Sequence, residues 1–342
     1  MKKIWSCTVF AFTLSLTFVG TATSETTKIR FAENWILNGT NIPEYVAQEK
    51  GWYAQEGLGL TINRGFGAAD TFKRVEAGSL DIGLGVMVSV AMGRGQGAKV
   101  KIIQLVMATS PYGLAYLKGI GINKPKDLDG RRVAIPGGSS VLQFWPAFAK
   151  KNGIDMKKNQ LINMGPGSLG KALAHNRVDA VDSYLSSLPV HKRAAAQQGR
   201  EVGFFLWSDY GLSDMYGGTF IARDDTIQER PQIIQKFVRA TIRGSRHAHL
   251  NPKEAVDIFI KYNPGRNRKQ VEAEWKAMKI LSFDENTKTD GYGAVNKGKM
   301  ERALQLIEKY IGLKDKSVKA GDLYTNQFVD KTPRQWRFFS AK

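Results

Sequence analysis

The chain has 342 residues, enough for two domains with buried cores, and its hydrophobic content of 42% is ordinary for a globular protein. It carries 50 Lys and Arg residues against 31 Asp and Glu residues, a net charge of +19, and these charges are spread along the whole sequence. No arginine-rich arm and no nucleic-acid-binding motif accompanies them. We therefore interpret the charge as a solvated basic surface and expect no nucleic-acid partner.

Residue types that hold metals or act as thiol nucleophiles are scarce. Cys7 is the only cysteine, and the four histidines show no spacing typical of a metal site. The closest pair, His247 and His249, is two residues apart, which suits different faces of a helix. We expect no metal, no cofactor and no catalytic constellation.

The first 24 residues have the features of a secretory signal peptide. Lys2 and Lys3 precede an apolar segment at 4–19, and the small residues at 22–24 form a cleavage pattern. The apolar segment is shorter than a typical membrane span, and an uncleaved anchor is the alternative. Cleavage of 1–24 would remove Cys7 and deliver the protein to the periplasm.

Residues 29–85 alternate between strand-like and helix-like segments joined by short loops. Strand segments at 29–32, 60–63 and 80–85 are separated by helical segments at 42–55 and 70–77. This alternation predicts a parallel sheet covered by helices, with a ligand beyond the carboxyl ends of the strands. The candidate ligand-binding residues at these ends are Trp35, Asn38, Asn41, Gly67, Ala68 and Met87.

A second copy of this pattern occurs about one hundred residues later. Ile62-Asn63-Arg64-Gly65-Phe66-Gly67 has a partner in Ile162-Asn163-Met164-Gly165-Pro166-Gly167. Each string is followed by a helical run and then by a strand that contains an aspartate, Asp81 or Asp179. The repeat predicts an α/β protein with two similar lobes, joined by two crossover segments, that face one another across a ligand cleft.

The composition along the chain suggests how the lobes are divided. We place the first lobe at 25–110 and 221–330, the second at 111–220, and a loosely held basic tail at 331–342. The return crossover contains Tyr216, a further candidate for ligand binding, beside the flexible point Gly217-Gly218. Four later helices should pack on the first lobe, at 231–249, 252–262, 268–280 and 297–310.

Polar residues also follow two predicted strands of the second lobe. Ser139 or Ser140 would cap a helix at 141–151, and that helix end is either simply capped or a site for an anion or carbonyl. Asp182 and Tyr184 end the next strand, where an acid and a phenol could contact the amino group and the ring of a ligand.

A glycine-rich string precedes that strand. Gly165-Pro166-Gly167-Ser168-Leu169-Gly170-Lys171-Ala172 nearly matches a phosphate-binding loop. Ala172 stands where a Ser or Thr would hold magnesium, and the preceding strand is short. We favour a tight turn before a helix.

Several strings together resemble the periplasmic solute-binding proteins of ABC importers. They are Trp35-x-x-Asn38, Tyr45-Val46-Ala47-Gln48-Glu49-Lys50-Gly51-Trp52-Tyr53, Glu56-Gly57-Leu58, Gly78-x-Leu80-Asp81-Ile82-Gly83 and Lys126-Asp127-Leu128-x-Gly130-x-x-Val133-Ala134. The resemblance is to the branch for nitrate, sulfonates, taurine and pyrimidine precursors of thiamine. It implies a type 2 periplasmic binding fold whose lobes close on a solute, and an ABC permease with a separate ATPase as partners. We expect a monomer.

The ligand implied by the resemblance depends on the first loop. Its Trp and Asn resemble the pyrimidine-precursor binders, which typically have Asp where Asn34 stands and His where Asn41 stands. We expect a heterocycle like a thiamine pyrimidine precursor, stacked on Trp35 and hydrogen-bonded to Asn38 and Asp182. The alternative is a sulfonate, taurine, nitrate or another small organic anion at the helix end of Ser139 and Ser140.

An enzyme of the same fold is the alternative from another functional class. A pyrimidine synthase related to these binding proteins uses a cysteine-rich motif and an active-site histidine, and it has no export signal. Because this chain has no cysteine after Cys7 and begins with a signal peptide, we expect a binding protein and not an enzyme.

Overall fold

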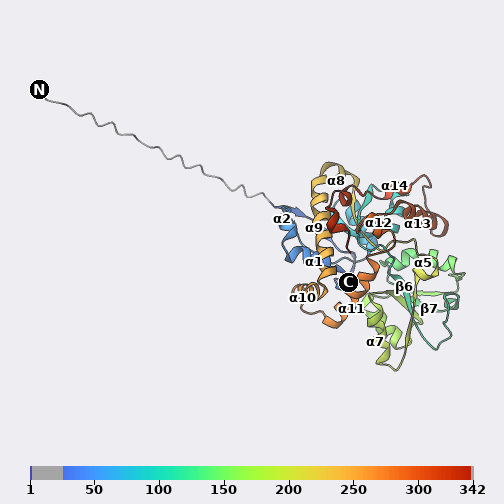
Figure 1. Cartoon of the computed structure of the whole chain (residues 1–342). Helices are drawn as coiled ribbons and strands as arrows, with labels where there is room; N and C mark the ends of the chain where they lie inside the picture. The colour runs from blue at the N-terminus through green and yellow to red at the C-terminus, as the bar shows by residue number, and fades with distance from the viewer. Residues whose placement is uncertain (2–25, 340–342) are drawn as a thin grey trace.

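The computed structural model describes Met1 and residues 26–339, and it shows two α/β lobes side by side (Figure 1). The predicted signal peptide and Cys7 lie outside the described residues, apart from Met1, as do the last three residues of the tail. Within residues 26–339, no helix is both long enough and apolar enough to cross a membrane.

The first lobe is built on a four-stranded sheet with the order β2-β4-β11-β5. These strands are β2 (Phe31–Ala32), β4 (Ile82–Val86), β11 (Gly218–Arg223) and β5 (Val100–Leu105). β1 (Thr27–Ile29) and β3 (Leu58–Leu60) form a separate parallel pair. The strand predicted at 60–63 therefore begins earlier, and Asn63 joins the main sheet through an isolated bridge to Ala32.

The second lobe is built on a five-stranded sheet with the order β10-β6-β9-β7-β8. These strands are β10 (Val202–Leu206), β6 (Tyr112–Leu117), β9 (Ala180–Tyr184), β7 (Arg132–Ala134) and β8 (Gln160–Ile162). β6 and β9 lie inside the sheet, and their residues are almost all buried.

Both sheets are mixed, so the prediction of parallel sheets is wrong in part. β2 is parallel to β4, and β7 is parallel to β8 and β9, as the strand–helix alternation predicts. β11 is antiparallel to β4 and β5, and β6 is antiparallel to β9 and β10. β6 and β11 enter their sheets directly from the other lobe, and a strand without a helical crossover behind it need not be parallel.

Helices cover the sheets of both lobes. Those before the return crossover are α1 (Ile42–Glu49), α2 (Trp52–Gln55), α3 (Ala68–Glu76), α4 (Met87–Arg94), α5 (Ser140–Lys151), α6 (Leu169–Ala174) and α7 (Leu188–Ala196). Short 3-10 helices are η1 (Gly39–Asn41), η2 (Pro125–Leu128), η3 (Pro166–Ser168) and η4 (Trp207–Tyr210). The helical run predicted at 42–55 is interrupted at Gly51, which has φ 67°.

The C-terminal third is helical and packs mainly on the first lobe (Figure 1). It contains α8 (Asp224–Glu229), α9 (Pro231–Leu250), α10 (Pro252–Tyr262), α11 (Arg268–Leu281), α12 (Thr287–Asp290), α13 (Lys297–Tyr310), α14 (Ala320–Leu323), α15 (Gln327–Asp330) and α16 (Arg334–Arg337). α9, α10, α11 and α13 confirm the four predicted helices. α9 and α10 pack on α1, whereas α13 contacts α4 of the first lobe and also α5 of the second.

The described part of the predicted tail is packed rather than loose. α16 lies against α9, and Trp336 and Phe339 pack on the core of the first lobe. The Phe339 ring centroid is 5.3 Å from that of His249 and 5.4 Å from that of Phe283. Aromatic side chains bury a large apolar area, which explains why this basic segment is held.

A buried lysine of α13 ties the two crossovers together. The Lys299 ammonium donates to the Ala108 carbonyl oxygen of the first crossover at 2.7 Å and to Asp284 Oδ2 at 2.8 Å. The same ammonium lies 4.7 Å from the ring centroid of Tyr216, in the return crossover. The crossovers also pair directly, because Gly217 N donates to the Met107 carbonyl oxygen at 3.2 Å.

Candidate functional site

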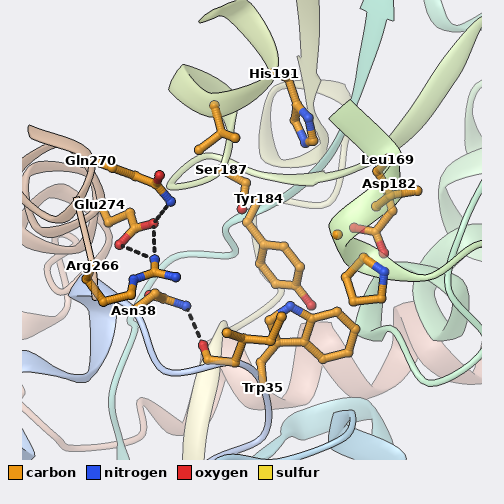
Figure 2. Close-up of a pocket in the computed structure, with 14 residues that line it drawn as sticks. Trp35, Asn38, Leu169, Asp182, Tyr184, Ser187, His191, Arg266, Gln270 and Glu274 are labelled. Atoms are coloured by element: carbon orange, nitrogen blue, oxygen red, sulfur yellow. Dashed lines mark hydrogen bonds and ion pairs between the residues drawn. The ribbon is translucent and has the colours of Figure 1, made fainter. Parts of the chain in front are cut away.

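A cavity of about 160 Å³ lies between the two lobes. Its lining residues come from the loop after β2, from η3, α6, β9 and α7 of the second lobe, and from the turn before α11 and the first half of that helix. They are Trp35, Ile36, Asn38, Pro166, Gly167, Leu169, Asp182, Tyr184, Ser187, Val190, His191, Arg266, Gln270 and Glu274. A smaller hollow of about 50 Å³ shares Trp35, Asn38, Tyr184 and Ser187 with it. Figure 2 shows Trp35 near Tyr184, with Asp182 to one side and Glu274 to the other.

The loop that carries Trp35 is held by its own hydrogen bonds. Asn38 Oδ1 accepts from Thr40 N at 2.9 Å, and Asn38 Nδ2 donates to the Ile36 carbonyl oxygen at 3.0 Å. Asn38 N donates in turn to Asn41 Oδ1 at 3.0 Å. Asn38 therefore lines the cavity, but its amide is engaged within the loop. Asn41 is buried and does not line the cavity; its side chain accepts a hydrogen bond within the loop.

Asp182 and Tyr184 supply the polar wall of the second lobe. The Asp182 side chain is buried, and its Oδ2 has no hydrogen-bond partner among the described residues. Burial raises the pKa of Asp182 to about 7, although the Ser139 hydroxyl acts in the opposite direction. Burial also raises the pKa of Tyr184, so the phenol is a neutral donor at pH 7.

The helix end of Ser139 and Ser140 is next to this wall but does not line the cavity. Ser139 caps α5, because its Oγ accepts from Val141 N at 3.1 Å. Both serines are buried, and their hydroxyls are close enough to Tyr184 to influence its pKa. The predicted anion site at this helix end thus lies beside a carboxyl group, that of Asp182.

Four other predicted ligand-binding residues lie outside the cavity. Ala68, Met87 and Tyr216 belong to the hydrophobic core, and the Tyr216 hydroxyl donates to the Asn296 carbonyl oxygen at 3.2 Å. The sequence places these residues near strand ends, but it does not show that their side chains point into the hydrophobic core rather than into the cavity. Gly67 lies at the interface of the lobes, where a Cβ would be 2.3 Å from the Gly138 carbonyl oxygen of the second lobe.

The sequence reasoning missed the polar group at the start of α11. Glu274 Oε2 accepts from Gly39 N at 2.7 Å, and Oε1 accepts from Arg266 Nη2 at 3.1 Å and from Gln270 Nε2 at 2.8 Å. Figure 2 shows this group on the far side of the cavity from Asp182. Glu274 lies on the same helix face as the buried Val271 and Trp275, and a charge on an apolar face is a signal for such a role.

His191 of α7 was also missed. It lines the cavity and is buried, and its Nδ1 has no hydrogen-bond partner within residues 26–339. Burial lowers the pKa of His191 to about 4, so the imidazole is neutral at pH 7.

The remaining histidine pair serves the packing of the first lobe. His247 Nε2 lies 2.7 Å from Glu254 Oε2, and His249 Nδ1 lies 2.7 Å from the Ser245 carbonyl oxygen. Among the residues that the structure describes, no group of three or more His, Cys, Asp or Glu side chains has an arrangement suited to a metal ion.

Solved structures with the same architecture share little sequence with this chain. The alkanesulfonate-binding protein SsuA from Xanthomonas axonopodis pv. citri, bound to MOPS, superposes with a TM-score of 0.66 at 14% identity. The match covers 89% of this chain and all of the SsuA chain. The periplasmic nitrate-binding protein NrtA from Synechocystis gives a TM-score of 0.65 at 13% identity, over 93% of this chain and 92% of the other. These matches confirm the two-lobed binding-protein fold.

Relatives with more similar sequences carry names from two functional classes. A 4-amino-5-hydroxymethyl-2-methylpyrimidine phosphate synthase from Legionella pneumophila is 24% identical, over 88% of this chain and 92% of its own. The riboflavin-binding protein RibY from Chloroflexus aurantiacus is 25% identical, over 88% and 86%. The formylaminopyrimidine-binding protein from Halalkalibacterium halodurans is 23% identical, over 86% and 88%.

The family model described as NMT1/THI5 like matches residues 38–255, which is more than half of the chain. This match includes the loop of Asn38, the whole second lobe and the return into the first. The chain belongs to the NMT1/THI5-like family.

Proposed function

We propose that this protein is the extracytoplasmic solute-binding component of an ABC importer. It captures a small aminopyrimidine-like heterocycle in the cavity between its lobes and delivers it, unchanged, to a membrane permease driven by a separate ATPase. Cleavage of the signal peptide proposed for residues 1–24 would release the protein into the periplasm. The family membership, the two-lobed fold and the names of several relatives support this role.

The observation that carries the proposal is that the buried carboxyl group of Asp182 keeps one oxygen, Oδ2, without a hydrogen-bond partner among the described residues, in a cavity that also contains the indole of Trp35. Trp35 and Asp182 both line the cavity, one from each lobe. A protonated carboxyl group has one donor and one acceptor, which match the ring nitrogen and the adjacent amino group of an aminopyrimidine. The ionised form would still accept from the amino group. The aromatic ring would stack on Trp35.

The size of the cavity also favours a single ring. A cavity of about 150 Å³ holds one benzene molecule. The cavity here, about 160 Å³, has room for one substituted ring in this conformation, and a three-ring flavin would require the lobes to move apart. The pyrimidine-binding relative is therefore a better guide to the ligand than the riboflavin-binding one.

The synthase names among the relatives make catalysis the second candidate function. His191 lines the cavity, and the synthase uses an active-site histidine. The cysteine-rich motif of that enzyme has no counterpart here, because Cys7 is the only cysteine of the chain. We therefore assign the cavity to binding.

Calorimetry on the chain from residue 25 onward tests the proposal. We expect 4-amino-5-hydroxymethyl-2-methylpyrimidine or its formylamino relative to bind, and Trp35→Ala to weaken binding roughly tenfold or more. Riboflavin, ethanesulfonate and nitrate are the competing probes. Binding of riboflavin alone, or no effect of Trp35→Ala on affinity, would contradict the assignment of this cavity.

Mass spectrometry of the released ligand separates binding from catalysis. A binding protein releases only the pyrimidine that was added, whereas a synthase releases newly formed pyrimidine phosphate even when no pyrimidine is added. The variant His191→Ala provides the control, because it should not change the identity of the released compound in a protein that only binds.

A further inference from the structure

The structure assigns to Glu274 the exclusion of anionic solutes from the cavity, because it neutralises the one arginine of the cavity wall. This inference rests on the proposed binding function and adds the charge class of the solute. Two structural neighbours are named for binding anions, a sulfonate and nitrate. The charge of the cavity wall therefore bears on whether this cavity takes an anion or a neutral heterocycle.

Arg266 is the cation through which an anion would be held. Among the cavity-lining residues it is the only Arg or Lys, and it stands in the turn between α10 and α11. Its Nη2 is bound to Glu274, and its Nε is buried without a hydrogen-bond partner in the described part of the chain. A planar guanidinium with free N–H groups is the preferred partner of a sulfonate or carboxylate.

Glu274 is fixed in the position that cancels this charge. Its side chain is 6% exposed, and it accepts hydrogen bonds from Gly39 N, Arg266 and Gln270. The bond to Gly39 crosses 235 positions of sequence and joins α11 to the loop that carries Trp35. The carboxylate therefore has little freedom to move away from Arg266 when a solute enters.

The rest of the cavity wall reinforces this charge balance. Asp182 is the second acid of the wall, and the imidazole of His191 is neutral at pH 7. An anion entering the cavity would meet two carboxyl groups and one paired arginine. A neutral heterocycle that carries an amino group meets acceptors at both ends of the cavity.

The variant Glu274→Gln removes the negative charge and keeps the shape of the side chain. The glutamine carbonyl oxygen still accepts from Gly39 N, so the loop of Trp35 keeps its anchor. We expect the variant to bind ethanesulfonate about tenfold more tightly than the unchanged protein, because Arg266 is then unpaired. The aminopyrimidine carries no negative charge for Arg266 to hold, so its affinity should not rise.

Two further variants make the result specific. Glu272→Gln is the matched control, because Glu272 is on the same helix, is half exposed and lies 3.9 Å from Arg268 rather than in the cavity. It should leave sulfonate binding unchanged. The double variant Arg266→Gln, Glu274→Gln should lose any sulfonate affinity that Glu274→Gln gains.

The outcomes for this inference and for the proposed function are separate. If Glu274→Gln folds and binds the aminopyrimidine but gains no affinity for sulfonate or nitrate, the role of Glu274 is refuted and the importer function stands. Tight sulfonate binding by the unchanged protein refutes it as well. If the unchanged protein binds no pyrimidine and Glu274→Gln gains sulfonate binding, the role of Glu274 stands and the pyrimidine assignment falls.

Discussion

The two lobes contain the same turn from helix to strand, fixed by the same ion pair. In the first lobe, Asp81 accepts from Arg30 N at 2.9 Å, from Arg30 Nε at 3.2 Å and from Arg30 Nη2 at 2.7 Å. In the second lobe, Asp179 accepts from Arg132 N at 2.9 Å, from Nε at 3.1 Å and from Nη2 at 2.8 Å. This agreement in geometry supports the internal repeat that the sequence predicts.

The residues before these aspartates repeat the same backbone. Gly78 and Asn176 each stand three residues before the aspartate, with φ 71° and 53°. Asn176 is the one non-glycine residue with positive φ within residues 26–339, and asparagine tolerates this conformation better than most residues. Both turns therefore end the preceding helix in the same way.

The lobes differ at the opposite ends of the two strands. Counted from the aspartates, Leu84 is equivalent to Asp182, and Val86 is equivalent to Tyr184. In both pairs, the residue of the first lobe is apolar and the residue of the second lobe is polar. One scaffold is thus used twice, but only the second lobe has polar side chains at these strand positions. The first lobe contributes Trp35 from the loop after β2 and the polar group around Glu274 from α11.

The largest effect on stability is expected from Asp182→Asn, which makes the end of β9 as uncharged as the end of β4. The pKa of Asp182 is raised to about 7 by burial, so the folded state holds a proton that the unfolded state releases above about pH 4. Stability of the unchanged protein therefore falls as pH rises from about 4 to 7. The variant lacks this ionisation and should be more stable than the unchanged protein at pH 8 by up to about 4 kcal/mol.

Urea denaturation at pH 4, 6 and 8 measures this difference. The gap between Asp182→Asn and the unchanged protein should be smallest at pH 4 and level off above pH 7. Asp209→Asn is the control, because Asp209 is an exposed acid of the same lobe. A gap that does not vary with pH would show that the carboxyl group is solvated in the folded protein.

Sequence reasoning identified those residues of the candidate cavity that lie at strand ends. Trp35, Asp182 and Tyr184 were identifiable because a strand pattern has a definite end and the carboxyl ends of parallel strands meet at one edge. It could not tell which of the neighbouring side chains turn inward. Met87 begins α4 immediately after β4, and its side chain enters the core.

The α11 side of the site could not be predicted because it depends on a long-range contact. Glu274 and Gly39 are joined by a hydrogen bond across 235 positions, and no local pattern encodes such a pairing. The antiparallel strands escaped prediction for a similar reason. The direction of β6 and β11 is set by where the crossovers enter each sheet, and residue periodicity is the same for both directions.

A second, smaller effect is expected from removing the repeated aspartate in each lobe. Asp81 also accepts from Arg230 Nη1 at 2.9 Å, whereas Asp179 has one arginine partner. Asp81→Ala should therefore cost about 2–3 kcal/mol of unfolding free energy, and Asp179→Ala about 1–2 kcal/mol. Asp70→Ala removes an exposed pair with Arg74 and should cost less than about 0.5 kcal/mol.

The stability that the Asp81 and Asp179 ion pairs contribute changes with pH in the opposite direction to the contribution of Asp182. Burial alone would raise the pKa of Asp81 and Asp179, but the arginine hydrogen bonds hold both values below the usual range. Their stabilisation is complete above about pH 4 and is lost as the pH falls through the lowered pKa. Equal costs of the two alanine variants would show that Arg230 adds nothing to the first lobe.

The smallest effect, on ligand affinity, is expected from substituting the repeated glycines, Gly67 and Gly167. The two differ in the atoms that an added Cβ would contact. Gly67 has φ 127°, and a Cβ there would lie 2.3 Å from the Gly138 carbonyl oxygen across the cleft. Nothing lies within 4 Å of a Cβ at Gly167. Gly67→Ala therefore both strains the backbone and separates the lobes, and should weaken aminopyrimidine binding about tenfold, or about 1.4 kcal/mol.

Gly167→Ala should change that affinity less than about threefold, because its methyl group takes only a little space at the edge of the cavity. Small-angle scattering adds a measurement that does not depend on the ligand. If the contact between Gly67 and Gly138 limits closure, only Gly67→Ala should increase the radius of gyration. An unchanged radius with weakened binding would locate the effect in the loop of Trp35, since Gly67 N donates to the Asn34 carbonyl oxygen at 2.8 Å. Variants of the two glycines thus distinguish closure of the lobes from support of the loop, although the sequence around the two glycines is alike.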